Sequence, residues 1–356
     1  MSIEYGTKDG AVLWIRNPFT GNVTYFNNIH RKPHAYRHLT NPQQSAPTTP
    51  SPPSTYDLCA DMQRVQDACV FCPGNEAMTM EEVMRVTYGD MHPGVAPPDG
   101  SHSEDWAIRV VRNIVPRIPE ACTGGRNESY VIIEDARHFL PGGADLTDLM
   151  WSGALSATQY YHVLRTTADV VRHAMDNPAV KSVLIRKHQG QESGASQPHI
   201  HIQAIGADRI FPDVEQEMAV TARHPEVWQE SVELMRCFGF HLHEDDGIVS
   251  HWSPFGKFGR HFEVIALDDR QPLHAIPDHR LRLFAQHLHR LLRALHTAPH
   301  DLELHHGDGI PLHVHVNGRR YVYANFAGTL NAPADLATNY MPPTRHAMHE
   351  MAQQAT

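Results

Sequence analysis

The chain has 356 residues, of which 41% are hydrophobic and 20% charged, enough for one large globular domain or two ordinary ones. No run of 18 or more apolar residues occurs, and no basic patch with an apolar stretch opens the chain, so neither a membrane partner nor a secretory signal is expected. Lys plus Arg number 30 against 40 for Asp plus Glu, and this net charge of −10 argues against a nucleic-acid partner but allows a nucleotide pocket.

The cysteines number five, an odd count that does not suggest a disulfide framework in a chain without an export signal. We therefore expect a reduced, cytoplasmic protein in which Cys69 and Cys72 are free to bind a metal. The 28 histidines are several times the usual number for this length, so a lone histidine carries little information. Only histidines in tight, patterned groups are functional candidates.

The N-terminal part is predicted to contain one hairpin followed by loops. Residues 11–26 are two β-rich runs around a turn of Asn, Pro, Thr and Gly, which is typical of a β-hairpin. Residues 40–56 are rich in Pro, Ser, Thr and Gln and are predicted to form a loop. Residues 89–104 form a second loop, rich in Gly, Pro, His and Ser.

Two later stretches follow the same plan. The first is predicted to contain strands at 106–111 and 130–134, a helix at 151–175, and strands at 182–187 and 199–205. The second is predicted to contain a strand at 262–267, a helix at 278–295, and strands at 302–305 and 311–316. Each copy ends on a strand that holds His-x-His. This internal duplication predicts an α+β fold with antiparallel sheets and helices packed on one face.

The strongest chemical motif is Pro198-His199-Ile200-His201-Ile202-Gln203. On a strand, alternate residues share a face, so His199, His201 and Gln203 are predicted to point the same way. The preceding Ser193-Gly194-Ala195-Ser196 offers backbone N–H groups and a hydroxyl, a combination that binds phosphate. A neutral imidazole beside such a loop can attack phosphorus. The alternative is an exposed strand without a function in a His-rich protein. The Gly-Ala-Ser segment before the motif makes this alternative less favoured.

A second motif is Cys69-Val70-Phe71-Cys72. Two cysteines at this spacing can chelate zinc through their thiolates, while a redox pair or two ordinary cysteines is the alternative. A structural zinc site needs two further ligands. His138 and His199 are the candidates, because each is predicted to lie at an edge of the first copy.

Several segments together resemble the galactose-1-phosphate uridylyltransferase branch of the histidine-triad superfamily, which also includes phosphorylases of ADP-sugars and dinucleoside tetraphosphates. The resemblance covers roughly residues 11–340, in the family's order. Its motifs are Asn17-Pro18-Phe19-Thr20-Gly21, His30-Arg31-Lys32-Pro33, Cys69-x-x-Cys72-Pro73-Gly74-Asn75, Asn113-Ile114-Val115-Pro116, Ser196-Gln197-Pro198-His199-x-His201-x-Gln203 and the weaker run 331–337.

The resemblance implies a duplicated histidine-triad-like fold, with halves at residues 1–210 and 211–356. It implies that His201 is the nucleophile and forms a covalent nucleotidyl-histidine intermediate. Gln203 would hydrogen-bond the phosphoryl oxygens, and Ser196 would donate to the departing or incoming phosphate. The residues expected to contact the substrate are Arg31, Asn113, Gly194 and Ala195.

The resemblance also implies metals and an assembly. Zinc would be held by Cys69, Cys72, His138 and His199. A second divalent metal, iron or zinc, would be held in the second copy by Glu217, His313, His315 and one of His305 and His306, of which His306 is taken as the ligand. Members of the family are often dimers, so a homodimer is a further expectation.

The expected reaction is hexose-1-phosphate uridylyltransferase-like, with a nucleotide sugar and a sugar-1-phosphate as substrates. An ADP-sugar or dinucleoside polyphosphate phosphorylase, with phosphate as acceptor, is the nearest alternative, and a non-catalytic metal- or nucleotide-binding relative is a distant one. Two departures leave the substrate open. Ile114 replaces the Asp that follows the pocket Asn in the uridylyltransferases, and the family's Glu-Asn-Lys-Gly segment appears as residues 188–192 without its Asn.

Overall fold

The structure is a computed structural model that describes residues 5–8, 12–16, 23–27, 62–95, 106–144, 148–190, 193–238, 241–252, 261–296 and 299–318. Several predicted features lie outside the described residues: the motifs at 17–21, 30–33 (with Arg31) and 331–337, the loop at 40–56 and residues 96–104 of the second loop.

The predicted hairpin is present as β2 (Val12–Arg16) and β3 (Val23–Asn27), which pair antiparallel. A third strand, β1 (Tyr5–Lys8), which the sequence pattern did not predict, pairs with β2. These strands form a small sheet of their own, separate from the main one. The predicted hairpin is therefore confirmed and is one strand larger than expected.

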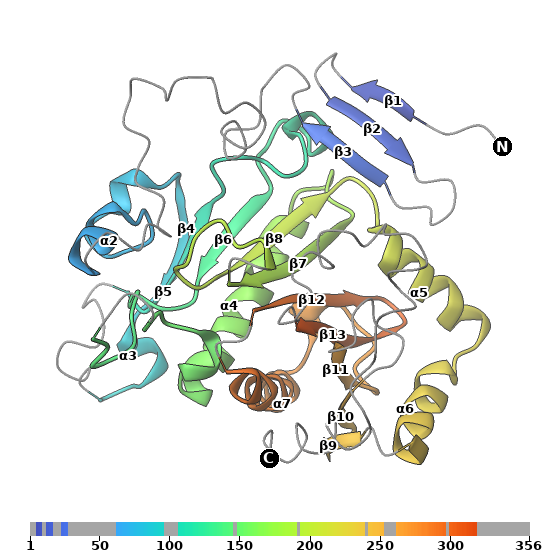
Figure 1. Cartoon of the computed structure of the whole chain (residues 1–356). Helices are drawn as coiled ribbons and strands as arrows, with labels where there is room; N and C mark the ends of the chain where they lie inside the picture. The colour runs from blue at the N-terminus through green and yellow to red at the C-terminus, as the bar shows by residue number, and fades with distance from the viewer. Residues whose placement is uncertain are drawn as a thin grey trace, which may run out of the picture.

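The main sheet has ten strands, all paired antiparallel (Figure 1). In spatial order, the first five are β4 (Glu82–Val86), β5 (Ile108–Arg112), β6 (Ser129–Ile133), β8 (His201–Ala207) and β7 (Ser182–Gln189). The next five are β12 (His300–Gly307), β13 (Ile310–Gly318), β11 (His261–Ala266), β10 (Ile248–Trp252) and β9 (His241–Asp245). Counted inward from its outer edge, the second half has the order β9-β10-β11-β13-β12, which matches β4-β5-β6-β8-β7 of the first half. The predicted duplication is therefore visible in the sheet. The halves meet where β7 pairs with β12, and they share one sheet instead of forming separate ones.

The two predicted long helices are α4 (Ala157–Met175) and α7 (Asp278–Leu295), which lie side by side on one face of this sheet (Figure 1). The apolar residues of α7 recur at helical spacing and are buried against the strands. Helix α4 begins at Ala157 and not at Trp151, because the Ser156 side chain caps it by accepting a hydrogen bond from the Gln159 N–H. A single 3₁₀ turn, Ser152–Ala154, precedes the cap.

Two helices that the sequence analysis did not predict, α5 (Pro212–Arg223) and α6 (Val227–Phe238), pack on strands of the second half. Their partners Val249 and Ile265 belong to a small core distinct from the one under α7, so they cover the opposite face. Two shorter helices, α2 (Met62–Ala68) and α3 (Tyr88–Met91), belong to the first half. In the described part of the chain, no helix is long and apolar enough to cross a membrane.

Side-chain alternation in β8 and β13 decides which face carries the polar groups. Ile202 and Ala204 of β8 lie in the core under α4 and α7, so His201 and Gln203 point to the opposite face. In β13 the apolar Val314 faces the same core, and His313 and His315 face away from it. The two His-x-His motifs therefore open on the same face of one sheet.

The buried histidine His287 gives the fold a defined acid sensitivity. Its Nδ1 lies 2.9 Å from the Ser250 hydroxyl, and burial, then the nearby His243 and Arg290, lower its pKa to about 4. Between pH 6.5 and 4 the unfolded chain binds a proton here that the folded chain does not, so stability falls as the pH falls through this window. We expect His287→Gln to reduce the loss of unfolding free energy between pH 7 and pH 5 by up to about 2 kcal/mol. Urea unfolding at the two pH values measures this, and an unchanged pH dependence would contradict it.

Candidate nucleotide site and metal centres

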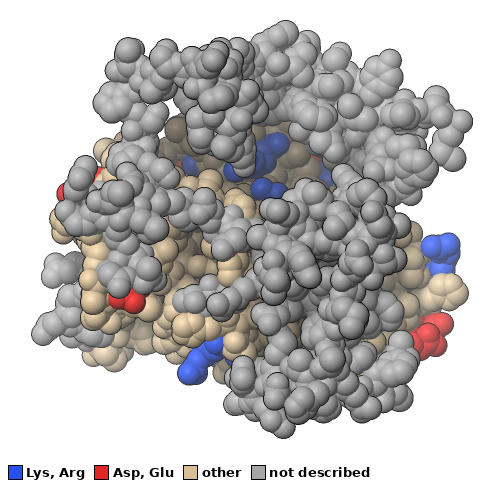
Figure 2. All heavy atoms as spheres, in the orientation of Figure 1, with Lys and Arg blue, Asp and Glu red and all other residues tan. Residues whose placement is uncertain are grey.

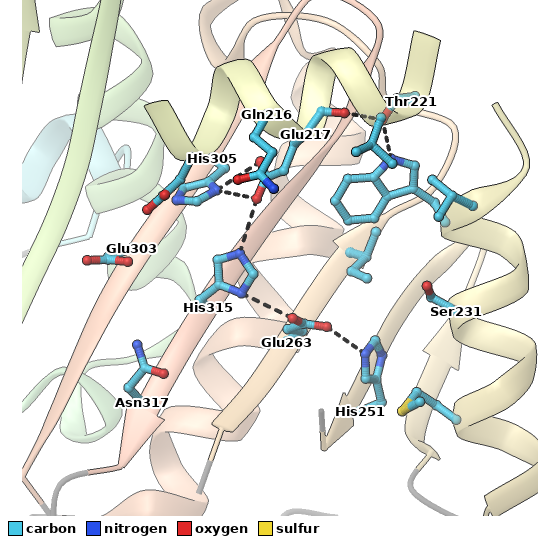
Figure 3. A pocket seen from close by; sticks show the side chains of 16 residues that line it. Gln216, Glu217, Thr221, Ser231, His251, Glu263, Glu303, His305, His315 and Asn317 are labelled. Carbon is cyan, nitrogen blue, oxygen red and sulfur yellow. Dashed lines mark hydrogen bonds and ion pairs between the residues drawn. The ribbon is translucent and has the colours of Figure 1, made fainter. Parts of the chain in front are cut away.

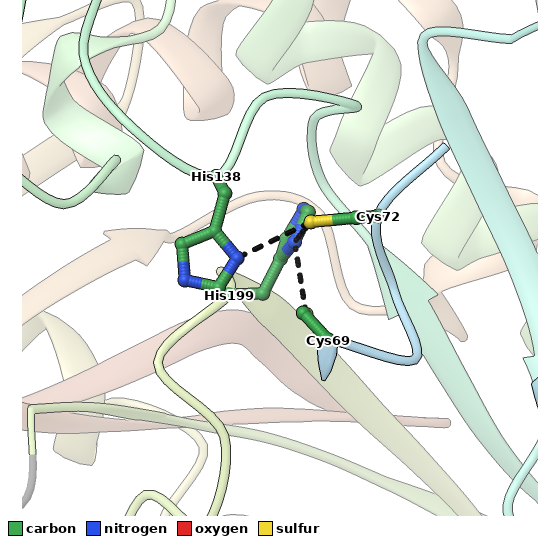
Figure 4. Close-up of side chains that lie close together, drawn as sticks. All are labelled: Cys69, Cys72, His138 and His199. Atoms are coloured by element: carbon green, nitrogen blue, oxygen red, sulfur yellow. Dashed lines mark hydrogen bonds between the residues drawn. The ribbon is translucent and has the colours of Figure 1, made fainter. Parts of the chain in front are cut away.

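Four buried side chains, Cys69, Cys72, His138 and His199, converge on one point in the first half (Figure 4). The Cys72 Sγ lies 3.3 Å from His138 Nδ1 and 3.6 Å from His199 Nδ1, and Cys69 Sγ also lies 3.6 Å from His199 Nδ1. All four ligand atoms lie within 4.8 Å of one another. The structure thus brings together every residue of the predicted zinc set.

The donor set and its spacing fit zinc. Tetrahedral zinc with Zn–S near 2.3 Å and Zn–N near 2.05 Å places S and N ligand atoms about 3.6 Å apart. The three S–N separations given above are 3.3, 3.6 and 3.6 Å. A hydrogen bond from the Cys72 thiol, with others from His138 and His199, lowers the pKa of Cys69 against the effect of burial, which favours the thiolate. The Nε2 of His199 lies 2.7 Å from the Asp135 carbonyl oxygen, so that ring nitrogen donates outward and Nδ1 faces the centre.

The Cys-x-x-Cys-Pro-Gly-Asn segment holds its own shape. The Asn75 side-chain amide donates to three backbone carbonyls, those of Gln66, Asp67 and Cys69. Gly74 has φ of +90°, a value that only glycine adopts without strain. These contacts fold the chain after α2 into a tight knuckle that directs both sulfurs inward.

His201, the predicted nucleophile, is buried and fixed in one tautomer. Its Nδ1 lies 2.8 Å from the carbonyl oxygen of His199. A carbonyl oxygen only accepts, so Nδ1 carries the proton and Nε2 keeps its lone pair. Burial, and next the charge of Lys187, lower the pKa of His201 to about 4 despite that hydrogen bond. The imidazole is therefore neutral near pH 7, as a nucleophile must be.

A cavity of about 550 Å³ lies in front of His201. That volume is typical of sites for small ligands and cofactors. Its lining includes every described residue predicted to act on or bind the substrate: Asn113, Gly194, Ala195, Ser196, His201 and Gln203. The departure Ile114 also lines it and is 73% exposed, so it stands at the mouth.

Gln203 is oriented by a residue that the sequence analysis did not single out. The Nε of Arg186, on β7, donates to Gln203 Oε1 at 3.3 Å, since the two residues are direct cross-strand partners. Because the amide oxygen is taken, the amide NH₂ is left to donate into the cavity. The signal in the sequence was the alternation of β7, in which Val183 and Ile185 face the core and Arg186 therefore faces away from it.

A second cluster lies in the other half, where Glu217 of α5 meets His305, His313 and His315. Figure 3 shows Glu217 with His305 and His315. Glu217 Oε1 lies 2.9 Å from His305 Nδ1, 3.4 Å from His313 Nε2 and 3.7 Å from His315 Nε2. His315 Nδ1 lies 3.1 Å from Glu263, which in turn lies 2.8 Å from His251. A carboxylate behind a histidine is the usual outer shell of a metal ligand.

The chemistry of this cluster also fits a divalent cation. The Nδ1 of His313 lies 2.8 Å from the Pro311 carbonyl, so its buried Nε2 faces Glu217 as an acceptor. Hydrogen bonds to Glu217 and Glu263 outweigh burial and raise the pKa of His315 to about 10. A cluster of a carboxylate and imidazoles that favours a positive charge in this way is one that a divalent cation would stabilise. A cavity of about 380 Å³ opens beside the cluster.

The choice of His306 as the third histidine of this cluster was wrong, because the structure places His305 there. Neighbouring residues of a strand point to opposite faces, and the pairing of β12 with β13 shifts register between His305 and Gly307. His306 instead lines a small cavity of about 110 Å³ together with His274.

Glu217→Gln is expected to weaken metal binding at this second cluster by at least roughly 100-fold, because it removes the charged ligand. The Cys–His cluster of the first half should keep its metal. Metal analysis after dialysis gives the stoichiometry. The indole of Trp228 lies 4.6 Å from the His313 ring, so quenching of its fluorescence by Co²⁺ should report binding, with Trp228→Phe as the control. Two retained equivalents in Glu217→Gln would contradict this assignment.

Solved structures with the same fold include proteins of the expected kind. A uridylyltransferase aligns with 96% of this chain and 97% of its own, with a TM-score of 0.61 and 17% identity. An ADP-glucose phosphorylase from Arabidopsis thaliana, solved with bound ADP-glucose, aligns with 97% and 98%, with a TM-score of 0.59 and 14% identity. A GalT-like protein from Arabidopsis thaliana covers 81% and 91%, with a TM-score of 0.58 and 15% identity. The predicted fold is confirmed.

No curated protein matches the sequence significantly. Residues 120–301 match the family described as a domain of unknown function (DUF4921). The matched segment runs from the turn before β6 to the start of β12. It includes β8, which carries His201 and Gln203, and the two strands that pair with β8, which are β6 and β7. This segment is slightly more than half of the chain, and the protein therefore belongs to the DUF4921 family.

Proposed function

We propose that this protein is a nucleotidyltransferase that works through a covalent nucleotidyl-histidine intermediate on His201. The observation that carries the proposal is the state of this side chain. Its tautomer is fixed by the His199 carbonyl, it lines a cavity of nucleotide size, and burial lowers its pKa, which favours the neutral imidazole. The fold shared with a uridylyltransferase and an ADP-glucose phosphorylase supports the same chemistry.

In the first half-reaction, His201 Nε2 attacks the α-phosphorus of a nucleoside-diphosphate compound. A P–N bond forms, the bond from phosphorus to the bridging oxygen breaks, and that oxygen leaves with the electron pair on the second phosphate. The Gln203 NH₂ donates to the phosphoryl oxygens, and the Ser196 hydroxyl donates to the departing phosphate. In the second half-reaction a phosphate-bearing acceptor attacks the same phosphorus and releases the histidine.

Zinc at the four Cys and His ligands would supply structural stability and no step of the reaction. The chain's own contribution is positional. His199 anchors the start of β8, and its carbonyl oxygen holds the proton of His201 Nδ1. The imidazole is thereby fixed before substrate binds, which lowers the entropy lost on reaching the transition state.

Incubation with α-³²P-labelled UDP-glucose and, separately, ADP-glucose tests the proposal. We expect an acid-labile, base-stable label that maps to His201 and is released by an acceptor. If neither compound, nor a GDP-sugar or a dinucleoside tetraphosphate, labels the protein, the proposal fails and a non-catalytic nucleotide-binding role becomes the better reading.

The acceptor divides two forms of the proposal. A hexose-1-phosphate acceptor makes the protein a hexose-1-phosphate uridylyltransferase-like enzyme, and inorganic phosphate makes it a phosphorylase of ADP-sugars or dinucleoside polyphosphates. Ile114 supports the phosphorylase form, because this exposed apolar side chain lies at the mouth of the pocket where the uridylyltransferases have an Asp. Product analysis of the labelled protein with each acceptor decides between them.

A further inference from the structure

The cavity in front of His201 carries a concentrated positive charge. Among its described lining residues are three arginines, Arg112, Arg117 and Arg186, and no Asp or Glu. The chain as a whole has ten more acidic than basic residues, so this composition is a local exception. Figure 2 shows Lys and Arg side chains grouped inside a recess in the upper part of this face. Such a pocket selects a ligand with more than one negative charge.

The three arginines are not equivalent. Arg112 already pairs with Glu81 at 3.0 Å and approaches Glu128 at 3.9 Å. Arg186 has no carboxylate within ion-pair distance in the described part of the chain, and Gln203 is the hydrogen-bond partner of its Nε. Burial, and next the like charge of Arg117, lower the pKa of Arg186, while Glu303, its cross-strand partner on β12, and Asp301 act in the opposite direction. Only the Nε of Arg186 donates to Gln203, so the NH₂ groups of the guanidinium remain available for an anion.

The position of Arg186 relates this fork to the reacting atoms. Arg186 and Gln203 are direct partners on β7 and β8, and His201 is two residues from Gln203 on the same face. Side chains of such cross-strand partners start about 5 Å apart. The Arg186 guanidinium therefore lies beside the Gln203 amide, on the side toward the centre of the sheet, where it can contact a phosphate next to the one that His201 attacks.

We propose that Arg186, which belongs to none of the family-like motifs, binds the second phosphate of the nucleotide compound. This is the phosphate that leaves in the first half-reaction and arrives with the acceptor in the second. The inference rests on the proposed function and adds to it the side chain that holds the leaving phosphate. As that bond breaks, negative charge grows on the leaving phosphate, and a bidentate guanidinium stabilises it.

The test compares two ways of labelling His201 that differ only in the leaving group. α-Labelled ADP-glucose and UDP-glucose release a phosphate, whereas the matching nucleoside 5′-phosphorimidazolides release imidazole. In Arg186→Gln we expect the labelling rate from the nucleotide sugars to fall by roughly 100-fold. The rate from the phosphorimidazolides should fall by no more than about threefold, which is the cost of losing the hydrogen bond that orients Gln203, and Arg186→Lys should recover part of the larger loss.

Arg172→Gln, on the exposed side of α4, is the matched control and should change neither rate. Equal losses with both kinds of donor in Arg186→Gln would overturn the inference, because Arg186 would then act on the transferred phosphoryl group or on the fold. Unchanged rates with both would overturn it too.

A binding measurement keeps the inference separate from the proposed function. If no donor labels even the unaltered protein, the proposed function fails, but calorimetric titration with inorganic phosphate still examines Arg186. Phosphate binding at least about tenfold weaker in Arg186→Gln than in Arg172→Gln supports the subsite. Equal binding to both variants rules it out.

Discussion

Replacing His201 by glycine is expected to abolish nucleotidyl transfer, with a fall in turnover of at least about 10⁴-fold. The variant loses the nitrogen that attacks phosphorus, whose tautomer the His199 carbonyl fixes. The measurement is formation of the covalent label and steady-state turnover with the donor and acceptor that the unaltered protein uses.

Two controls make this result specific. His224→Gly removes an exposed histidine after α5 and should leave turnover unchanged. The zinc content and thermal unfolding of His201→Gly should stay close to those of the unaltered protein, since His201 is outside the Cys–His cluster. Full turnover in His201→Gly would show that another group is the nucleophile.

Cys72→Ala is expected to have the largest effect on stability. It removes one thiolate and leaves Cys69, His138 and His199 buried beside Phe71 and Trp106 without a cation to bind them. Loss of a structural metal is among the most damaging single changes in a protein, so we expect the melting temperature to fall by roughly 10 °C or more. Covalent labelling should fall as well, because the His199 carbonyl that holds His201 is no longer anchored.

Cys122→Ala is the matched control, since Cys122 is also buried but lies in a separate core cluster. It should keep one equivalent of zinc and lose only the small stability of a truncated side chain, about 1 kcal/mol. Chelation of the unaltered protein should reproduce the melting temperature of Cys72→Ala. If Cys72→Ala melts no lower than Cys122→Ala, the cluster does not hold a structural metal.

Much of the first metal cluster and of the catalytic strand could be predicted from local patterns. Alternation along β8 indicated that His201 and Gln203 share a face, and the Cys-x-x-Cys spacing indicated a metal. His199 was placed on the strand, yet β8 begins at His201. The half-turn of irregular backbone before it lets His199 turn toward the cysteines while Ile200 enters the core.

What could not be predicted depends on contacts between distant segments. Arg186 faces the cavity because β7 pairs with β8, and no local signal states which strands are neighbours. His305 and His306 could have been told apart, because Leu302 and Leu304 face the core and alternation places His305, not His306, on the opposite face with His313. Helix α5, which supplies Glu217, lacked a clear signal because its apolar stripe is narrow, with Val214 and Thr221 as its buried residues.

The pairing of β7 with β12 has a consequence for how this protein could be divided or could have arisen. Five residue pairs, from His300↔Gln189 to Leu304↔Ile185, link the halves through the middle of the sheet. Expressing residues 1–210 alone would leave β7 as a bare edge, with its peptide groups open to any passing strand. The halves have the same strand order, but each one leaves a strand edge that only the other half covers. A single ancestral copy would have needed a second copy to pair with its exposed edge strand. A dimer of two identical chains joined at that strand is therefore the simplest ancestor of one fused chain.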